Sequence, residues 1–197
     1  MIIGVLCILA AVGLTGYNVY ESKRAQEVSA NAVKQLSDQI AAMELEKSEK
    51  EKEETPDYVL FPEMELPTIK LDDERYIGIL HMPSIDISLP VMGGEWSYAK
   101  LRKAPCLYSG SVYQNNMVIA GHNYRSHFSK IKGMDEGSEI YFVDVDGNVF
   151  SYVISWAEIL KPEDVEELIS GDDWDLTLFT CTYGGNERYV VRCNLTE

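Results

Sequence analysis

The sequence predicts a mainly β domain, either a closed barrel or a sandwich, preceded by an apolar N-terminal helix and a polar helical segment. Two observations predict the β domain. The chain beyond residue 71 contains several short apolar runs of strand length, and glycine, proline or Asp-Gly turn signals separate these runs. The whole chain has 197 residues, a length that fits one domain with appendages.

The first element is an apolar run. Residues 2–20 carry no formal side-chain charge, and a helix of that length measures about 28 Å, near the hydrocarbon thickness of a bilayer. The run fits a membrane helix or a signal-peptide core. The nearest small-residue cleavage pattern, at residues 30–32, lies too far beyond it for good processing, so we expect an uncleaved transmembrane anchor over residues 1–20. Lys23 and Arg24 follow it, and the positive-inside rule alone would place the later chain in the cytoplasm.

The second element, residues 21–54, is predicted to be one polar helical stalk because it contains no Gly or Pro. Val33, Leu36, Ile40 and Met43 recur at steps of three and four, which gives a narrow apolar stripe. The stripe fits either a coiled coil or a solvated helix. Because it is shorter than the three or so heptads that a coiled coil needs, the prediction favours a solvated or partly disordered spacer.

The third element, residues 55–70, is predicted to be an extended linker because its three prolines are incompatible with a regular helix. Tyr58, Leu60 and Phe61 are expected to lay it against the following domain. We expect that domain to occupy residues 71–197, a length that can bury a working core.

Within the domain the apolar runs predict the order of the elements. The Asp146-Gly147 pair predicts a tight hairpin. Strands are predicted over residues 76–82, 85–92, 116–120, 138–144, 148–160 and 176–181, with a return strand from residue 189. Short helices are predicted over residues 96–103, 126–132 and 161–169.

Charge and cysteine content exclude several classes of function. The formal net charge of −15 argues against a nucleic-acid partner, because phosphate binding needs basic patches. The cysteines lack C-x-x-C spacing, and three of the four lie outside the apolar run, so they indicate neither a disulfide framework nor a zinc site. Asp144 and Asp146 are predicted to form the hairpin turn rather than a calcium site. We therefore expect no metal and no cofactor.

The strongest candidate for chemistry is Cys181. It ends a β-prone apolar run, and a glycine-rich turn follows it before the return strand. A thiolate nucleophile needs a partner that shares its proton, and histidine titrates in the right range. His122 is the best-placed histidine because it leaves an apolar strand through Gly121. His81 and His127 are predicted to be structural or surface histidines.

A cation completes the candidate site. Arg188 opens the return strand, where a guanidinium can hydrogen-bond a substrate carbonyl or the oxyanion that forms in acyl transfer. Arg192 is the rival, because a residue four positions along a strand points to the same face. A surface salt bridge is the alternative for either arginine. A small buried thiol is the alternative for the other cysteines, Cys106 and Cys193.

Three separated motifs resemble the sortases, the Gram-positive cysteine transpeptidases. The sequence T-L-F-T-C at residues 177–181, followed by a strand that opens on Arg188, resembles the sortase cysteine signature. A-G-H-N at residues 120–123 resembles the family's histidine motif, and residues 76–91 resemble its first two barrel strands. The resemblance implies a closed eight-stranded β-barrel and catalytic roles for His122, Cys181 and Arg188. It also implies that Thr180 helps Arg188 contact a sorting-signal peptide.

The resemblance further implies a membrane-anchored enzyme with an extracytoplasmic catalytic domain, which overrides the charges of Lys23 and Arg24. Such an enzyme cleaves an LPxTG-like sorting signal through a thioester at Cys181. It transfers the secreted protein to an amine of a cell-wall precursor or a pilin. Two alternatives remain: a cysteine hydrolase that gives the acyl group to water, and a non-catalytic surface scaffold. The intact His122, Cys181 and Arg188 set argues against the scaffold.

Overall fold

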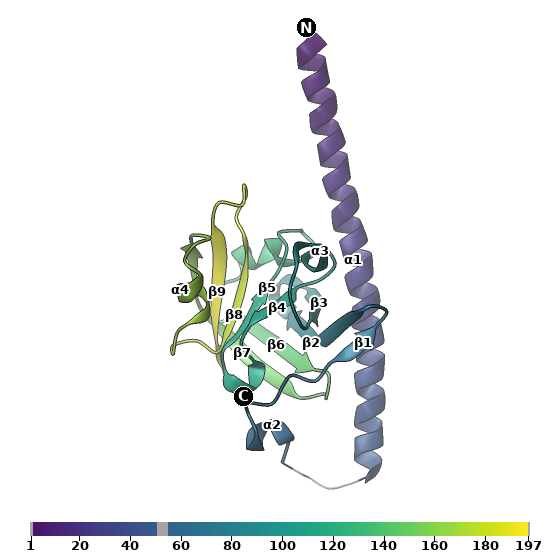
Figure 1. The fold of residues 1–197 in the computed structure, drawn as a ribbon, viewed down its shortest axis with the longest axis vertical. Helices are drawn as coiled ribbons and strands as arrows, with labels where there is room; N and C mark the ends of the chain where they lie inside the picture. The colour runs from purple at the N-terminus through teal and green to yellow at the C-terminus, as the bar shows by residue number, and fades with distance from the viewer. Residues whose placement is uncertain (1, 51–54, 197) are drawn as a thin grey trace.

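The computed structural model describes residues 2–50 and 55–196, and shows a barrel with one long helix along its side (Figure 1). The strands are β1 (Ile69–Leu71), β2 (Glu74–Met82), β3 (Ile87–Met92), β4 (Cys106–Ser109), β5 (Met117–Ala120), β6 (Glu139–Asp144), β7 (Val149–Leu160), β8 (Leu176–Cys181) and β9 (Arg188–Leu195). The helices are α1 (Ile2–Lys50), α2 (Asp57–Leu60), α3 (Tyr98–Leu101) and α4 (Val165–Ile169), with 3₁₀ turns η1 (Pro83–Ile85), η2 (Val112–Gln114) and η3 (Phe128–Gly133).

Eight of the strands close into a barrel. They follow the order β2-β3-β4-β5-β8-β9-β7-β6, and β6 pairs back onto β2, for example at Leu80 and Phe142. β1 is an additional strand on β2. The neighbours are antiparallel except for β3–β4 and β5–β8, which are parallel. The predicted closed eight-stranded barrel is therefore confirmed.

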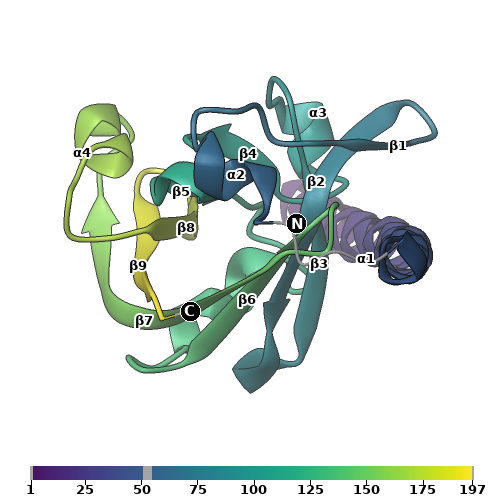
Figure 2. The ribbon, with the colours of Figure 1, turned by 90° about the horizontal axis from the view of Figure 1, so that it is seen from below.

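Side chains alternate between two apolar clusters. Along β8, Leu176 and Leu178 belong to one cluster and Phe179 to the other, as the two-residue period of a strand requires. Leu36 of α1 belongs to the second cluster, and α1 lies outside the barrel (Figure 2). The second cluster therefore covers the outer face of the barrel, and the first fills its interior.

The hairpin between β6 and β7 forms where it was predicted. The carboxylate of Asp144 accepts hydrogen bonds from the backbone N–H groups of Asp146 and Asn148 at 2.9 and 2.8 Å, and from the hydroxyl of Tyr113 at 2.7 Å. Gly147 takes a positive φ of 88°, which a side chain would disfavour. Asp144 thus holds the turn, in agreement with the structural role expected for it.

The short helices and the linker differ from the prediction in extent. α3 has only four residues, and α4 begins at Val165. In the linker, Tyr58 stacks on Tyr113 with ring centroids 4.7 Å apart, whereas Leu60 and Phe61 are exposed. Tyr58 is therefore the one of the three predicted side chains that packs firmly.

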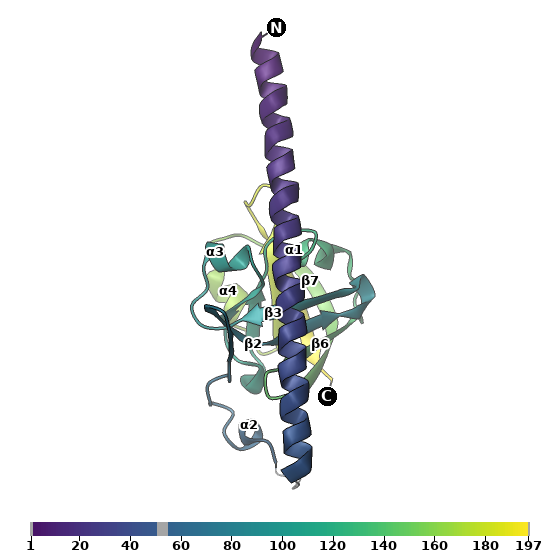
Figure 3. The ribbon, with the colours of Figure 1, turned by 90° about the vertical axis from the view of Figure 1, so that its right-hand side faces the viewer.

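The helix α1 corrects the prediction of a solvated spacer. It runs without interruption across the predicted boundary after residue 20, and its later turns lie along the barrel (Figure 3). Leu36 and Ile40 of the predicted stripe are buried in the outer cluster, so the stripe faces the barrel. Residues 51–54 of the predicted stalk lie outside the described residues. By length and composition α1 could cross a membrane, and its apolar residues 2–20 are exposed.

Candidate active site

Cys181 and Arg188 face each other on neighbouring strands. Cys181 is the last residue of β8, Arg188 is the first of β9, and the two are direct partners in the antiparallel register. The chain turns between them with positive φ at Gly184 and Gly185. The turn is closed by the N–H of Gly185 donating to the carbonyl of Thr182 at 3.0 Å. The glycines therefore allow the tight return that brings the arginine beside the cysteine.

His122 follows β5, which neighbours β8 on the side opposite β9. β5 and β8 are parallel, Ala120 is level with Phe179, and the N–H of Gly121 donates to the carbonyl of Phe179 at 2.9 Å. His122 follows the end of β5 by two residues, and Cys181 ends β8, so both lie at the same end of this pair of strands. The structure thus brings the three predicted catalytic residues to the same end of three adjacent strands.

Gly121 permits the close packing just before His122. A Cβ atom at this position would lie 2.2 Å from the ring of Phe128, which is fully buried in the barrel interior. The Phe128 N–H also donates to the carbonyl of His122 at 3.2 Å. The loop over residues 121–127, called here the histidine loop, is therefore held by the Phe128 ring, which only a glycine at position 121 can accommodate.

The environment of the His122 ring favours its neutral form. The ring stacks on Tyr124 with centroids 3.9 Å apart, and its Nδ1 is buried without a hydrogen-bond partner among the described residues. Burial lowers the pKa of His122, and the positive charge of Arg102 lowers it further. A neutral imidazole can accept the proton of a nearby thiol.

We expect the substitution Arg102→Gln to raise the pKa of His122, because it removes a positive charge that opposes protonation. The return toward the ordinary value is partial, since burial remains. The measurement is an NMR titration of the His122 ring. Arg125→Gln is the matched control. It removes a cation from the loop that carries His122, but Arg125 is not among the causes of the lowered pKa. An unchanged titration midpoint in Arg102→Gln would contradict the assignment.

The structure separates the two candidate arginines. Arg192 is buried, pairs with Glu158 at 2.8 Å, donates to Thr177 Oγ1 at 2.8 Å, and lies over the ring of Trp174. It also donates to the carbonyls of two residues of α4, Glu167 and Leu168, at 2.7 and 2.9 Å. Arg192 is thus committed to fixing α4 on the barrel, and it is unavailable to a substrate.

Arg188 has guanidinium N–H groups from which no described residue accepts a hydrogen bond. Its Nη1 donates to the carbonyls of Gly185 and Glu187 at 3.0 and 3.1 Å, which orients the guanidinium on the turn. A guanidinium has five N–H donors. The three on Nε and Nη2 have no partner within the described parts of the chain. Arg188 is therefore the arginine that can bind an incoming oxygen.

Thr180 lies on the opposite face of β8 from Cys181. It is buried and pairs with Tyr189 in the register, and neighbouring strand residues point to opposite faces. Its Oγ1 has no hydrogen-bond partner among the described residues. The hydroxyl is thus unused, but it does not share the face of Cys181 and Arg188.

Sequence reasoning did not find the contact between His127 and α1. His127 is fully buried, and its Nε2 lies 3.2 Å from Ser29 Oγ. The single hydrogen of the Ser29 hydroxyl is donated to the carbonyl of Lys103 at 2.8 Å, so Nε2 must be the donor to Ser29. Burial, and next the charge of His122, lower the pKa of His127 to about 4. The neutral ring therefore joins α1 to the histidine loop.

An aromatic row borders the cysteine. Phe179 is two residues before Cys181 and so shares its face. The ring of Phe179 meets Tyr108 edge-on at 5.1 Å, Tyr108 meets Trp96 at 5.5 Å, and Trp96 meets Tyr98 at 5.6 Å. Trp96 and Tyr98 are exposed. The row offers an apolar surface that leads to the thiol.

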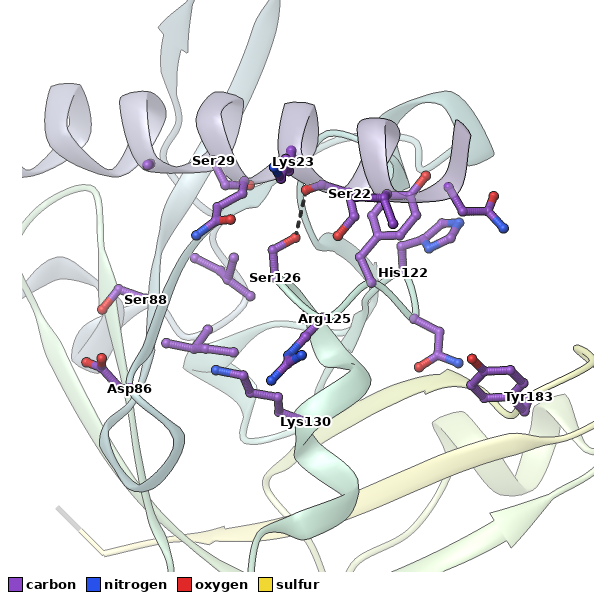
Figure 4. Close-up of a pocket in the computed structure, with 18 of the residues that line it drawn as sticks. Ser22, Lys23, Ser29, Asp86, Ser88, His122, Arg125, Ser126, Lys130 and Tyr183 are labelled. Carbon is purple, nitrogen blue, oxygen red and sulfur yellow. Dashed lines mark hydrogen bonds between the residues drawn. The ribbon is translucent and has the colours of Figure 1, made fainter. Parts of the chain in front are cut away.

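A polar cavity of about 1060 Å³ borders His122 on the side of α1. Figure 4 shows α1, with Ser22 and Lys23, on one side of this cavity, and Arg125 and Lys130 on the barrel side. The hydroxyl of Ser126 donates to the carbonyl of Ser22 at 3.2 Å across it. The cavity therefore lies between His122 and the part of α1 that follows the apolar segment.

The chain is similar to known proteins in sequence and in fold. The family model described as the sortase domain matches residues 80–196. Sortase A of Bacillus anthracis is 26% identical over 190 residues, which cover 93% of this chain and 87% of that protein. A Clostridium perfringens Sortase D5 transpeptidase has a similar structure, with a TM-score of 0.62, 22% identity, and coverage of 87% of this chain and 99% of that one. Sortase A from Corynebacterium diphtheriae gives a TM-score of 0.56 at 21% identity, covering 95% and 96% of the two chains.

Proposed function

Because the chain belongs to the sortase family of transpeptidases, we propose that it is a membrane-anchored cysteine transpeptidase that cleaves an LPxTG-like sorting signal and transfers the protein to an amine. The observation that carries the proposal is that Cys181 and Arg188 are paired on β8 and β9, while His122 follows the neighbouring strand β5 at the same end of the barrel. The proposed acceptor is an amine of a cell-wall precursor or a pilin subunit.

The proposed reaction has two steps. The Cys181 thiol passes its proton to the neutral ring of His122 as Sγ attacks the scissile carbonyl, and the free donors of Arg188 stabilise the oxyanion. The C–N bond then breaks, and the His122 imidazolium protonates the leaving amine. In the second step an acceptor amine attacks the thioester and gives a proton to His122. This releases the new amide and restores the thiol.

The aromatic row supports a peptide substrate. It places exposed apolar rings on the face that ends at Cys181, where they can pack against the apolar residues of a sorting signal. Thr180 is proposed to contribute to peptide binding indirectly, because its side chain is buried on the other face of β8. It would help to position the strand pair that carries Cys181 and Arg188, next to its own partner Tyr189.

The apolar start of α1 supports the membrane anchor. We propose that residues 1–20 span the cytoplasmic membrane once and that the barrel lies on the extracytoplasmic side. A reporter fused to the catalytic domain that is active only in the cytoplasm would contradict this orientation.

Incubation of the full chain in detergent with LPxTG-like peptides, with and without an added amine, tests the function. A transpeptidase gives a thioester adduct at Cys181 by mass spectrometry, and a new amide when the amine is present. A hydrolase gives only free acid even with the amine, and a scaffold gives neither adduct nor product. Either of the last two results would overturn the proposal for the peptides used.

We expect Trp96→Ala to raise KM by roughly 10-fold with a smaller change in kcat, because it removes binding energy of about 1.4 kcal/mol that is the same in the ground and transition states. Steady-state kinetics with a sorting-signal peptide provide the measurement. Val149→Ala is the matched control, since Val149 is also exposed but lies on the β6–β7 hairpin. A lower kcat with unchanged KM would argue against a binding role.

A further inference from the structure

Basic residues gather beside His122 in a chain that is otherwise strongly acidic. The sequence has 32 Asp and Glu residues against 17 Lys and Arg, yet residues 96–134 contain no acidic residue. The cations in this stretch are Lys100, Arg102, Lys103, Arg125, Lys130 and Lys132. Arg125 and Lys130 line the polar cavity together with Lys23 of α1, and Asp86 is the acidic residue that lines it.

These three cations have no acidic partner in the part of the chain that the structure describes. Among the described residues, none of the ion pairs involves Lys23, Arg125 or Lys130. The Nζ of Lys130 donates only to the carbonyl of Ile85, at 3.3 Å. Unpaired cations around a cavity attract anions. The acidic helix α4 lies on the far side of the barrel from α1 (Figures 1 and 2), whereas Arg125 and Lys130 lie at the cavity beside α1.

Contacts along α1 show how far the cavity with Lys23, Arg125 and Lys130 lies from the apolar segment. Ser126 contacts Ser22, only two residues beyond the apolar segment. The β6–β7 hairpin lies at the other end, because a Cβ on Gly147 would meet the Glu44 side chain, about 33 Å farther along the helix. Buried contacts from Ala25 to Ile40 fix the helix on the barrel. The direction of the apolar segment relative to the active site is therefore fixed.

A bilayer that contains residues 2–20 would consequently meet the barrel at its active-site end. Thr15, Asn18 and Val19 of the apolar segment line the same cavity as His122. The turn after Cys181 projects from the barrel in the same direction as the N-terminal half of α1 in two perpendicular views (Figures 1 and 3). Tyr183 in that turn is 99% exposed, and tyrosine is favoured at membrane–water interfaces.

We propose that the active-site end of the barrel docks on the bilayer surface, with Lys23, Arg125 and Lys130 binding the phosphates of anionic lipid headgroups and Tyr183 lying in the interface. This inference rests on the membrane span of the proposed function and is independent of the transpeptidation. It assigns Lys23 a role in lipid binding. It also means that substrates reach Cys181 from the membrane surface.

Photo-crosslinking of the full chain in lipid nanodiscs tests the docking. Benzoylphenylalanine replaces Tyr183 in one variant and Val149 in the other. Val149 is also exposed, but it lies on the hairpin at the Glu44 end. We expect lipid adducts at position 183 several-fold above those at position 149, with more adducts in phosphatidylglycerol than in phosphatidylcholine. Equal labelling at the two positions would overturn the proposal.

The double variant Arg125→Gln with Lys130→Gln tests the headgroup contact. Each cation near an anionic surface strengthens binding by roughly fivefold. In the double variant, the ratio of lipid adducts at position 183 in phosphatidylglycerol to those in phosphatidylcholine should therefore fall toward one. The matched control is Lys34→Gln with Lys70→Gln, which removes two exposed cations elsewhere. Lys34 lies about 21 Å along α1 from the end of the apolar segment, beyond the screening length of about 8 Å.

Two further outcomes would contradict the proposal. Labelling at position 183 that is indifferent to lipid charge and to the double variant would mean that the anchor alone sets the geometry. Hydrogen-exchange protection of residues 122–130 by soluble glycerol phosphate in phosphatidylcholine nanodiscs would mean that the cavity binds a soluble phosphate. Because neither readout depends on thioester formation, failure here and failure of the proposed transpeptidation are distinguishable.

Discussion

Replacing Cys181 with alanine is expected to abolish the thioester and to lower amide formation by about 10⁴-fold or more, because the nucleophile of the covalent route is removed. No other cysteine in the described chain can replace it. Burial raises the pKa of Cys106 to about 12 and also raises the pKa of Cys193, so both remain inert thiols. Cys181 is only partly buried, at a strand end.

The measurement combines mass spectrometry of the acyl-enzyme with product formation from a sorting-signal peptide and an amine. Cys7→Ala is the control, since it removes the exposed cysteine of α1 and should leave the rate unchanged. Unfolding must be excluded by the melting temperature of the alanine variant. Full turnover in a folded Cys181→Ala variant would show that the assigned nucleophile is wrong.

The strands and the pairing of Cys181 with Arg188 could be predicted because they depend on short-range signals. These signals left a closed barrel and a sandwich both open, and the closed barrel was predicted from the resemblance to the sortases. Apolar runs and turn residues define the strands, and the Asp146-Gly147 turn forms as its sequence indicates. The glycine turn between Cys181 and Arg188 likewise determines that their strands pair. The choice between Arg188 and Arg192 could not be made locally, because it depends on Glu158, which is 34 positions from Arg192.

The docking of α1 was missed for a related reason. Its apolar stripe is too short to distinguish a buried face from a solvated one, and the surface that receives it comes from distant parts of the chain. Ser29 and His127, which join the two, are 98 positions apart. The sequence places each in a polar context, so neither signals a contact. A buried polar pair of this kind becomes visible only when the barrel brings its members together.

That buried pair predicts that stability falls with acidification. The pKa of His127 is about 4 in the folded protein and about 6.5 when the ring is exposed to water. Between these values the unfolded chain binds a proton that the folded chain does not. The contribution of His127 is therefore complete above pH 6.5 and is lost as the pH falls toward 4. The loss amounts to about 3 kcal/mol over this range.

Comparison of variants isolates this loss from that of other titrating groups. His127→Gln should be less stable than the wild type near pH 7, but its free energy of unfolding should decline less between pH 6.5 and 4. Ser29→Ala removes the hydrogen-bond partner and keeps the titrating ring, so it should be destabilised while retaining the wild-type dependence on pH. Denaturant unfolding of the full chain in detergent at several pH values gives the measurement. Parallel pH curves for the wild type and His127→Gln would mean that protonation of His127 is not coupled to unfolding. They would also mean that acid leaves the contact between α1 and the histidine loop intact.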